Sequence, residues 1–135
     1  MKKPTPKSLK VKLWNLCKTI VRGRYVNKDG SYKCYTCDRR IEYPCDAHTA
    51  HFIPSGACGA FLRYDLRNIR ICCYNCNVNL GGNGVEFYPR MVREKGQEYV
   101  DQLFRDKQKI IKCDVIWLQS KINEYESLIS NLYEK

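Results

Sequence analysis

The sequence predicts an α+β domain that is stabilised by a metal ion and flanked by helices, and three observations lead to this prediction. Two Cys-x-x-Cys pairs, Cys34 to Cys37 and Cys73 to Cys76, enclose a segment of short, mixed-polarity strand patterns. Apolar residues recur at helical spacing near both ends of the chain. The length of 135 residues suits one domain of roughly 100 to 150 residues with an appended element. The expected order is a helix, two strands and a short helix around the metal, and a final long helix.

Four thiolates in two such pairs are the typical ligand set of a structural Zn²⁺ ion. Cys34, Cys37, Cys73 and Cys76 are the predicted ligands. Cys72 with Cys76 is an alternative second pair, but Cys73 repeats the spacing of the first pair. Because four thiolates leave the ion no open position for water, we expect zinc to fold the domain and not to catalyse a reaction.

The other cysteines do not indicate a secreted disulfide scaffold. The chain has nine cysteines, an odd number, and no apolar targeting segment follows its first residues. We therefore expect a reducing cytoplasm. The longest strongly apolar run, Val115 to Leu118, is far shorter than the roughly 20 residues that span a bilayer, so no membrane partner is expected. The pattern assigns no partner to Cys45, Cys58 and Cys113, and Cys17 falls on a helical stripe.

The N-terminal part predicts a basic tail followed by a basic amphipathic helix. Residues 1–7 hold two prolines among lysines, which indicates a disordered tail. From Ser8, a predicted N-cap, a helix is expected to extend to about Tyr25. Its apolar stripe consists of Leu9, Leu13, Leu16 and Ile20.

The central part predicts two strands and a short helix. Residues 41–54 and 62–72 have strand character, the second interrupted by a turn over residues 65–68. Asn77 is expected to open a short helix that Gly81 and Gly82 stop.

The last part predicts two further helices. Residues 86–95 suit a helix with Pro89 in its first turn and Gly96 at its end. Residues 106–135 contain an amphipathic helix with Asp114 as N-cap. Its apolar seam packs either on the N-terminal helix of the same chain, which we favour, or on a second subunit in a homodimer. The seam consists of Ile111, Val115, Leu118, Ile122, Tyr125, Ile129 and Leu132.

The charge distribution indicates a polyanionic partner. The formal net charge is +10, and residues 1–33 carry ten basic residues against Asp29 alone. Lysine and arginine at phosphates release counterions, so nucleic acid is the expected partner, although a solvated basic surface is the alternative. The candidate DNA contacts are Lys10, Lys12, Lys18, Arg22 and Arg24 in the helix and Arg63, Arg67 and Arg70 after it.

Four polar residues between and beside the cysteine pairs are candidates for the active site of a phosphodiester hydrolase. His51 is the candidate general base, because an imidazole with a pKa of about 6.5 is largely neutral at pH 7. Asn77 and His48 are candidate ligands of a catalytic Mg²⁺ or Mn²⁺ ion. Asn68 is expected to bond the backbone of the loop that presents His51. The alternatives are a structural role for His51, helix capping for Asn77, and a phosphate contact for His48.

In their order along the chain these residues resemble the phage NinG or Rap recombination endonucleases, a branch of the HNH or ββα-metal nucleases. The resemblance covers nearly the whole chain. It departs from other HNH branches at Ala50, Leu80, Gly81 and Arg70. The residues that carry it are Cys34-x-x-Cys37, His48-Thr-Ala-His51-Phe52, Leu62-Arg63-Tyr64-Asp65, Asn68-Ile69, Cys73-x-x-Cys76-Asn77, Gly82-Asn83 and Gly96-Gln97-Glu98-x-Val100-Asp101.

The resemblance implies a zinc-stabilised ββα-metal core, which is HNH-like and treble-clef-like, within a nuclease domain of residues 8–105. It implies a divalent-metal-dependent endonuclease that cuts branched DNA such as Holliday junctions and D-loops, in the cytoplasm of a bacterial host and encoded by a phage. Two other functions share the same features. One is a zinc-dependent nucleic-acid-binding module without catalysis, which has no need of His51. The other is a sequence-specific HNH nuclease, for which we identify no base-reading element.

Overall fold

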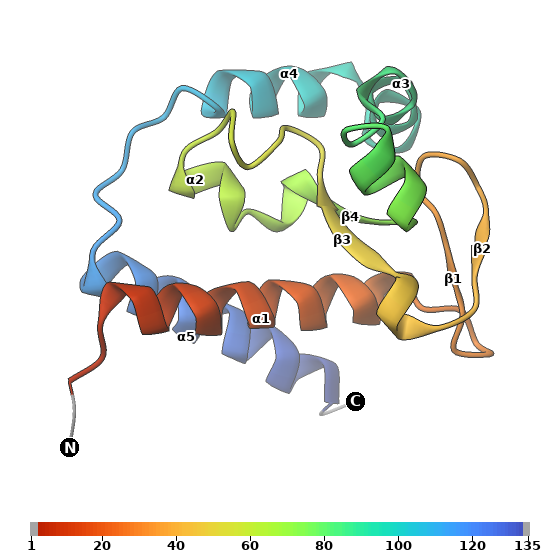
Figure 1. Ribbon diagram of the computed structural model, residues 1–135. Coiled ribbons are helices and arrows are strands. Elements are labelled where there is room, and N and C mark those ends of the chain that lie inside the picture. Colours follow the sequence, from red (N-terminus) through yellow and green to blue (C-terminus); the bar gives the residue numbers. More distant parts are fainter. Residues whose placement is uncertain (1–2, 134–135) are drawn as a thin grey trace.

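Two long helices lie on one side of the molecule, with the small sheets and shorter helices on the other (Figure 1). The structure is a computed structural model that describes residues 3–133, with side chains to residue 131. No helix within this described part is long and apolar enough to cross a membrane. The elements are α1 (Pro6–Tyr25), β1 (Tyr32–Lys33), β2 (Arg40–Ile41), β3 (His48–His51), α2 (Ala60–Arg63), β4 (Ile69–Cys72), α3 (Gly84–Lys95), α4 (Gln97–Asp106) and α5 (Val115–Tyr133).

The N-cap of helix α1 lies three residues earlier than the sequence predicts. Thr5, not Ser8, is the N-cap: its side chain accepts a hydrogen bond from the main-chain N–H of Ser8. Ser8 returns the contact by accepting from the N–H of Thr5, which completes a capping box. Pro6 occupies the first helical turn, where its missing N–H costs nothing. The end of the predicted tail, Pro6 and Lys7, is therefore helical.

Strands β3 and β4 form the antiparallel pair on which both histidines lie. His48 is paired with Cys72 and His51 with Ile69, so each end of β3 carries one histidine. The predicted second strand over residues 62–72 is only partly correct. Its first half forms α2 and a 3₁₀ turn over Leu66–Asn68, and only Ile69–Cys72 is extended.

The first predicted strand, residues 41–54, is also divided. Its start belongs to β2, which pairs with β1 near the first cysteine pair, and a 3₁₀ turn over Pro44–Asp46 separates β2 from β3. Proline at the start of that turn explains the interruption, since it supplies no N–H for a strand ladder.

The segment after β4 positions Asn77 inside a wide helical turn. This π-helical turn spans Asn75–Asn79, so Asn77 lies in its middle and does not open it as predicted. Gly81 and Gly82 follow with φ angles of +58° and +96°, values that favour glycine, and they end the turn. Helix α3 begins at Gly84, so Pro89 lies inside that helix and not in its first turn.

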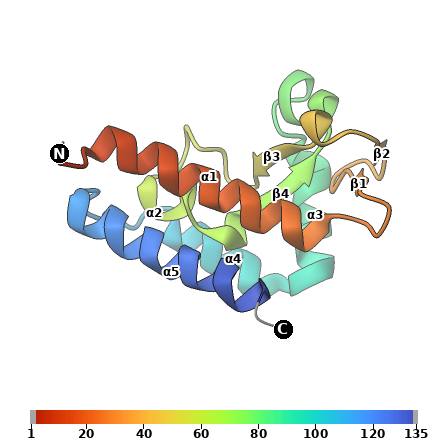
Figure 2. The same cartoon turned by 90° about the horizontal axis from the view of Figure 1, so that it is seen from below.

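Helices α1 and α5 run side by side in the same direction (Figure 2). Asp114 caps α5 as predicted, because its carboxylate accepts a hydrogen bond of 3.0 Å from the N–H of Trp117. Leu118, Ile122 and Tyr125 of α5 are buried in the core that α1 also enters. The middle of the seam therefore packs within its own chain, which is the favoured alternative. The side chain of Leu132 is outside the described side chains.

Candidate functional site

Four cysteine side chains converge between the β1–β2 hairpin and the segment after β4. The sulfur atoms of Cys34, Cys37, Cys73 and Cys76 all lie within 4.8 Å of one another, close enough to hold one metal ion. A tetrahedral site with Zn–S distances of about 2.3 Å has S···S edges of about 3.8 Å. The Sγ atoms of Cys37 and Cys73 are 3.7 Å apart, so the cluster fits an ion such as zinc.

Hydrogen bonds around this cluster support thiolate sulfurs. The N–H of Cys73 donates to the Cys34 sulfur at 3.3 Å, and the side-chain amide of Asn83 donates to the Cys76 sulfur at 3.5 Å. Such donors stabilise the anionic form that a metal requires. Cys72 lies outside the cluster, and its sulfur accepts from the Thr36 hydroxyl. The structure therefore favours Cys73 over Cys72 as the partner of Cys76 in the ligand set.

A cleft of about 710 Å³ lies between α1 and the end of β3. Lys10, Trp14 and Lys18 line it from α1, and His51 and Arg63 line it from the opposite side. Asn77 lines this cleft and also a smaller cavity of about 290 Å³ that His48 borders. The predicted base, Asn77 and part of the basic helix therefore share one cleft, and His48 borders a second cavity that also contains Asn77.

His51 is held at the rim of this cleft in one defined tautomer. Its Nε2 atom lies 2.9 Å from the main-chain oxygen of Arg63. A carbonyl oxygen only accepts, so Nε2 is the nitrogen that carries the hydrogen. Nδ1 then keeps its lone pair, and no hydrogen bond to it is found within residues 3–133. A neutral imidazole with a free lone pair is the form that a general base requires.

The surroundings of His51 favour this neutral form. Burial lowers the pKa of the imidazole, and the positive charge of Arg63 acts in the same direction. The hydrogen bond to the Arg63 carbonyl opposes this change but is the smaller effect. His51 is therefore ready to accept a proton at neutral pH.

His48 and Asn77 form a pair at the other end of β3. The side-chain Nδ2 atom of Asn77 lies 3.2 Å from Nδ1 of His48. Rotation of the Asn77 amide by half a turn would present its oxygen instead, so the pair could offer one imidazole nitrogen and one amide oxygen to a cation. The amide oxygen is a ligand of the type that Mg²⁺ and Mn²⁺ prefer, the imidazole is a less typical one, and waters would complete the coordination. Tyr74 packs edge-on against His48 at 5.5 Å between ring centroids.

Asn68 is fully buried and makes the backbone contacts that the sequence predicts for it. Its Oδ1 atom accepts from the N–H of Ile53 at 2.8 Å, and its Nδ2 donates to the Ile53 carbonyl at 3.0 Å. Ile53 follows His51 by two residues, so Asn68 fixes the loop directly after the histidine. It lies too deep to contact a substrate.

The predicted DNA contacts on α1 differ in their position relative to the cleft. Lys10 and Lys18 line it. Arg22 borders the smaller cavity beside His48, and its Nη2 donates to the Ala47 carbonyl at 3.2 Å. Lys12 and Arg24 are exposed but line neither cavity. The basic helix therefore presents only part of its charge to the site.

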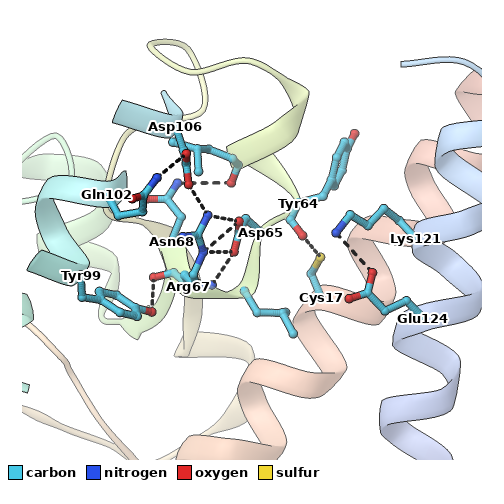
Figure 3. A network of polar contacts seen from close by, with 12 residues as sticks. Cys17, Tyr64, Asp65, Arg67, Asn68, Tyr99, Gln102, Asp106, Lys121 and Glu124 are labelled. Atoms are coloured by element: carbon cyan, nitrogen blue, oxygen red, sulfur yellow. Dashed lines mark hydrogen bonds and ion pairs between the residues drawn. The ribbon is translucent and has the colours of Figure 1, made fainter. Parts of the chain in front are cut away.

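Arg67 is engaged by carboxylates, which argues against the predicted phosphate contact. Its guanidinium forms ion pairs with Asp65 at 2.7 Å and with Asp106 at 2.8 Å (Figure 3). Gln102 donates to the second oxygen of Asp106, and the Tyr99 hydroxyl donates to the Arg67 carbonyl. This network joins α4 to the turn before β4 and has a structural role.

Arg70 cannot contact DNA where the structure places it, so its assignment as a DNA-binding residue is corrected. Its residue exposure is 2%, and its guanidinium pairs with Glu94 of α3 at 2.9 Å. The rings of Tyr25 and Tyr35 cover it at 5.9 Å and 5.4 Å. An arginine on a four-residue strand gives no sign in the sequence of which face it occupies. Arg63 is the one predicted arginine after α1 that lines the cleft.

Trp14 is the site residue that sequence reasoning missed. Its indole stacks on the imidazole of His51 with ring centroids 5.0 Å apart and planes inclined by 15°. Trp14 follows Leu13 of the buried stripe of α1. This position predicts a half-buried side chain but gives no indication of a contact with His51. No sequence pattern pairs the two rings, because α1 and β3 are brought together only by folding.

A protein-family model matches nearly the whole of this chain. The model described as "Bacteriophage Lambda NinG protein" matches residues 5–135. No curated protein and no solved structure matches significantly.

Proposed function

The chain belongs to the family of the bacteriophage lambda NinG protein, and we propose that it is a divalent-metal-dependent endonuclease that nicks branched DNA. The observation that carries this proposal is His51: a half-buried imidazole with Nε2 fixed by a carbonyl and Nδ1 left as a base. It lies in a cleft that Asn77 and three basic side chains also line. The antiparallel β3–β4 pair and the turn that carries Asn77 support an HNH-type ββα-metal core.

In the proposed reaction His51 accepts a proton from the attacking water at Nδ1. The imidazolium that forms keeps its Nε2–H bond to the Arg63 carbonyl, which stabilises the positive charge. Lys10, Lys18 and Arg63 place and neutralise the phosphates on either side of the scissile bond. The expected products carry 3′-hydroxyl and 5′-phosphate ends.

His48 and Asn77 would hold the catalytic Mg²⁺ or Mn²⁺ ion. When bound, the ion would stabilise the charge that develops on the phosphate and on the leaving oxygen. The cysteine cluster would have a structural role, because its four thiolates would leave a zinc ion no open position for water or substrate.

The proposed preference for branched DNA is what the resemblance to the family implies, and it is tested directly. Purified protein is incubated with Mg²⁺ or Mn²⁺ and with a four-way junction, a D-loop and a matched linear duplex of the same sequence. We expect nicks in the two branched substrates, little cutting of the duplex, and no reaction with a chelator. Equal cutting of all three would contradict the structure preference, and cutting of one duplex sequence alone would favour a sequence-specific nuclease.

A zinc-dependent DNA-binding module without catalysis is the second candidate, because the basic cleft serves binding equally well. It predicts junction binding by the wild-type protein but no cleavage with any divalent cation.

A further inference from the structure

The imidazole of His51 has two neighbours that fix different aspects of its orientation. The Arg63 carbonyl binds Nε2, which fixes one atom of the ring. A single hydrogen bond leaves the ring free to tilt about that contact. The indole of Trp14 lies against the ring face at 5.0 Å and within 15° of parallel, which removes this freedom.

Trp14 itself is held firmly by the core. Its neighbour along the chain, Leu13, is fully buried, as is Cys17 one turn later. These side chains belong to the core that Leu118 and Ile122 of α5 also enter. The indole is half-buried and packs against this core from α1, so it does not depend on a loop for its position.

We propose that Trp14 is the positioning residue of His51, holding the imidazole plane so that Nδ1 is presented to a water in the cleft. The role of His51 as a base rests on the proposed nuclease function, but the stacking contact does not. A base that is displaced by about 1 Å can lose a factor of about 100 in rate, which is the scale of effect expected when the stack is removed.

The contact can be tested by tryptophan fluorescence without any nuclease assay. The chain has two tryptophans and two histidines, so Trp117→Phe leaves Trp14 as the one emitting indole. An imidazolium against an indole quenches its emission, whereas neutral imidazole quenches less. We expect emission of the Trp117→Phe protein to fall as the pH falls through the pKa of His51. The charged and titratable groups that line the same cleft are Lys10, Lys18, Arg63 and Tyr64, and of these Arg63 acts on the pKa of His51.

Two matched variants identify the histidine responsible. His51→Gln in the Trp117→Phe background should abolish the pH-dependent quenching. His48→Gln, which removes the histidine that borders the smaller cavity with Trp14, should leave the quenching in place. Emission that does not depend on pH, or that responds to His48 and not to His51, would overturn the stack.

The positioning role is tested by single-turnover cleavage of the junction. Trp14→Ala should slow cleavage by about 10- to 100-fold with junction affinity retained, and Trp14→Phe should restore most of the rate because it keeps an aromatic plane. Circular dichroism checks that both variants are folded. Wild-type cleavage by folded Trp14→Ala would refute the proposal. If the wild-type protein cuts no DNA, the proposed nuclease function fails, while the fluorescence titration still decides whether Trp14 holds His51.

Discussion

The Nε2 atom of His51 lies 2.9 Å from the main-chain oxygen of Arg63, twelve residues further along the chain. This contact joins the end of β3 to the end of α2, and it determines which imidazole nitrogen is left to accept a proton.

The pH dependence of cleavage follows from the environment of His51. The neutral ring is the active base, and burial lowers its pKa below the ordinary value of 6.5. The cleavage rate should therefore rise with pH and reach half of its plateau value at a pH below 6.5. Single-turnover rates between mildly acidic and neutral pH measure this midpoint. A midpoint clearly above 6.5 would show that a different group titrates or that His51 is more exposed in solution.

Removal of the base should separate chemistry from binding. His51→Ala keeps Lys10 and Lys18 on α1, so junction affinity should persist. Cleavage should fall by about two to four orders of magnitude, the usual contribution of a positioned general base. Gel-shift and cleavage assays on the same preparation measure both quantities. Retained cleavage would place the base elsewhere.

Loss of one cluster cysteine should unfold the protein. The binding free energy of a four-thiolate ion contributes directly to folding, so Cys34→Ser or Cys76→Ser should give aggregated or unfolded protein. Cys45→Ser is the matched control, because Cys45 is exposed and lies outside the cluster. Elemental analysis should find one zinc per chain in the wild type. Soluble, active protein without zinc would refute the prediction.

Lys10 and Lys18 should contribute measurably to DNA affinity. Both line the cleft, so Lys10→Ala and Lys18→Ala should each weaken junction binding. Each should also lower the slope of log affinity against log salt by about 0.9 for every phosphate that the protein no longer neutralises. Lys95→Ala, at the end of α3 and outside the cleft, is the charge-matched control. Equal effects of all three changes would indicate a nonspecific dependence on net charge.

Substitutions on the two faces of α5 should differ strongly in their effect on stability. Leu118 is fully buried, and Leu118→Ala should lower the free energy of unfolding by about 2 to 5 kcal/mol. Ile116 is 80% exposed, and Ile116→Ala should change it by no more than about 0.5 kcal/mol. Chemical denaturation measures both. Similar values for the two variants would contradict the α1–α5 packing.

A homodimer stays a prediction. In this fold the middle of the apolar seam of α5 is buried within its own chain and does not form the interface of a dimer. Leu118 and Ile122 would have to leave their own core to meet a second subunit. Light scattering of the free protein and of the junction complex tests the dimer. A dimer would use another face, such as the one around exposed Ile116.

Part of this architecture could be read from the sequence because it depends on local rules. The spacing of Cys34 and Cys37 and of Cys73 and Cys76 predicts the metal cluster, since each pair forms one short turn whatever surrounds it. Asp114 could be identified as a cap for the same reason. The predicted start of α1 was wrong because Thr5 and Ser8 can both cap a helix, and Pro6 at the first helical position favours the earlier one.

Local rules do not predict the partners of the arginines in the middle segment. From the sequence, Arg63, Arg67 and Arg70 are equally good candidates for contacting DNA, because all three are basic residues near the predicted metal ligands. Their partners differ: Arg67 meets Asp106, and Arg70 meets Glu94. Asp106 and Glu94 lie more than twenty positions away in the chain, and only the pairing of Arg67 with Asp65 is local, so no local pattern predicts that Arg70 is buried while Arg63 lines the cleft.

By itself the sequence determined which four cysteines cluster, where the basic helix lies, and which polar residues, His48, His51, Asn68 and Asn77, are the candidates for the site. Only the tertiary structure decided that Trp14 stacks on His51 and that Nδ1 is its free nitrogen. The spacing of residue types along the chain predicts contacts between residues that are close in sequence, such as those within one helical turn. Contacts between α1 and β3 depend on how the whole core packs, because burial of Leu13 and Leu118 sets the position of α1 against the sheet.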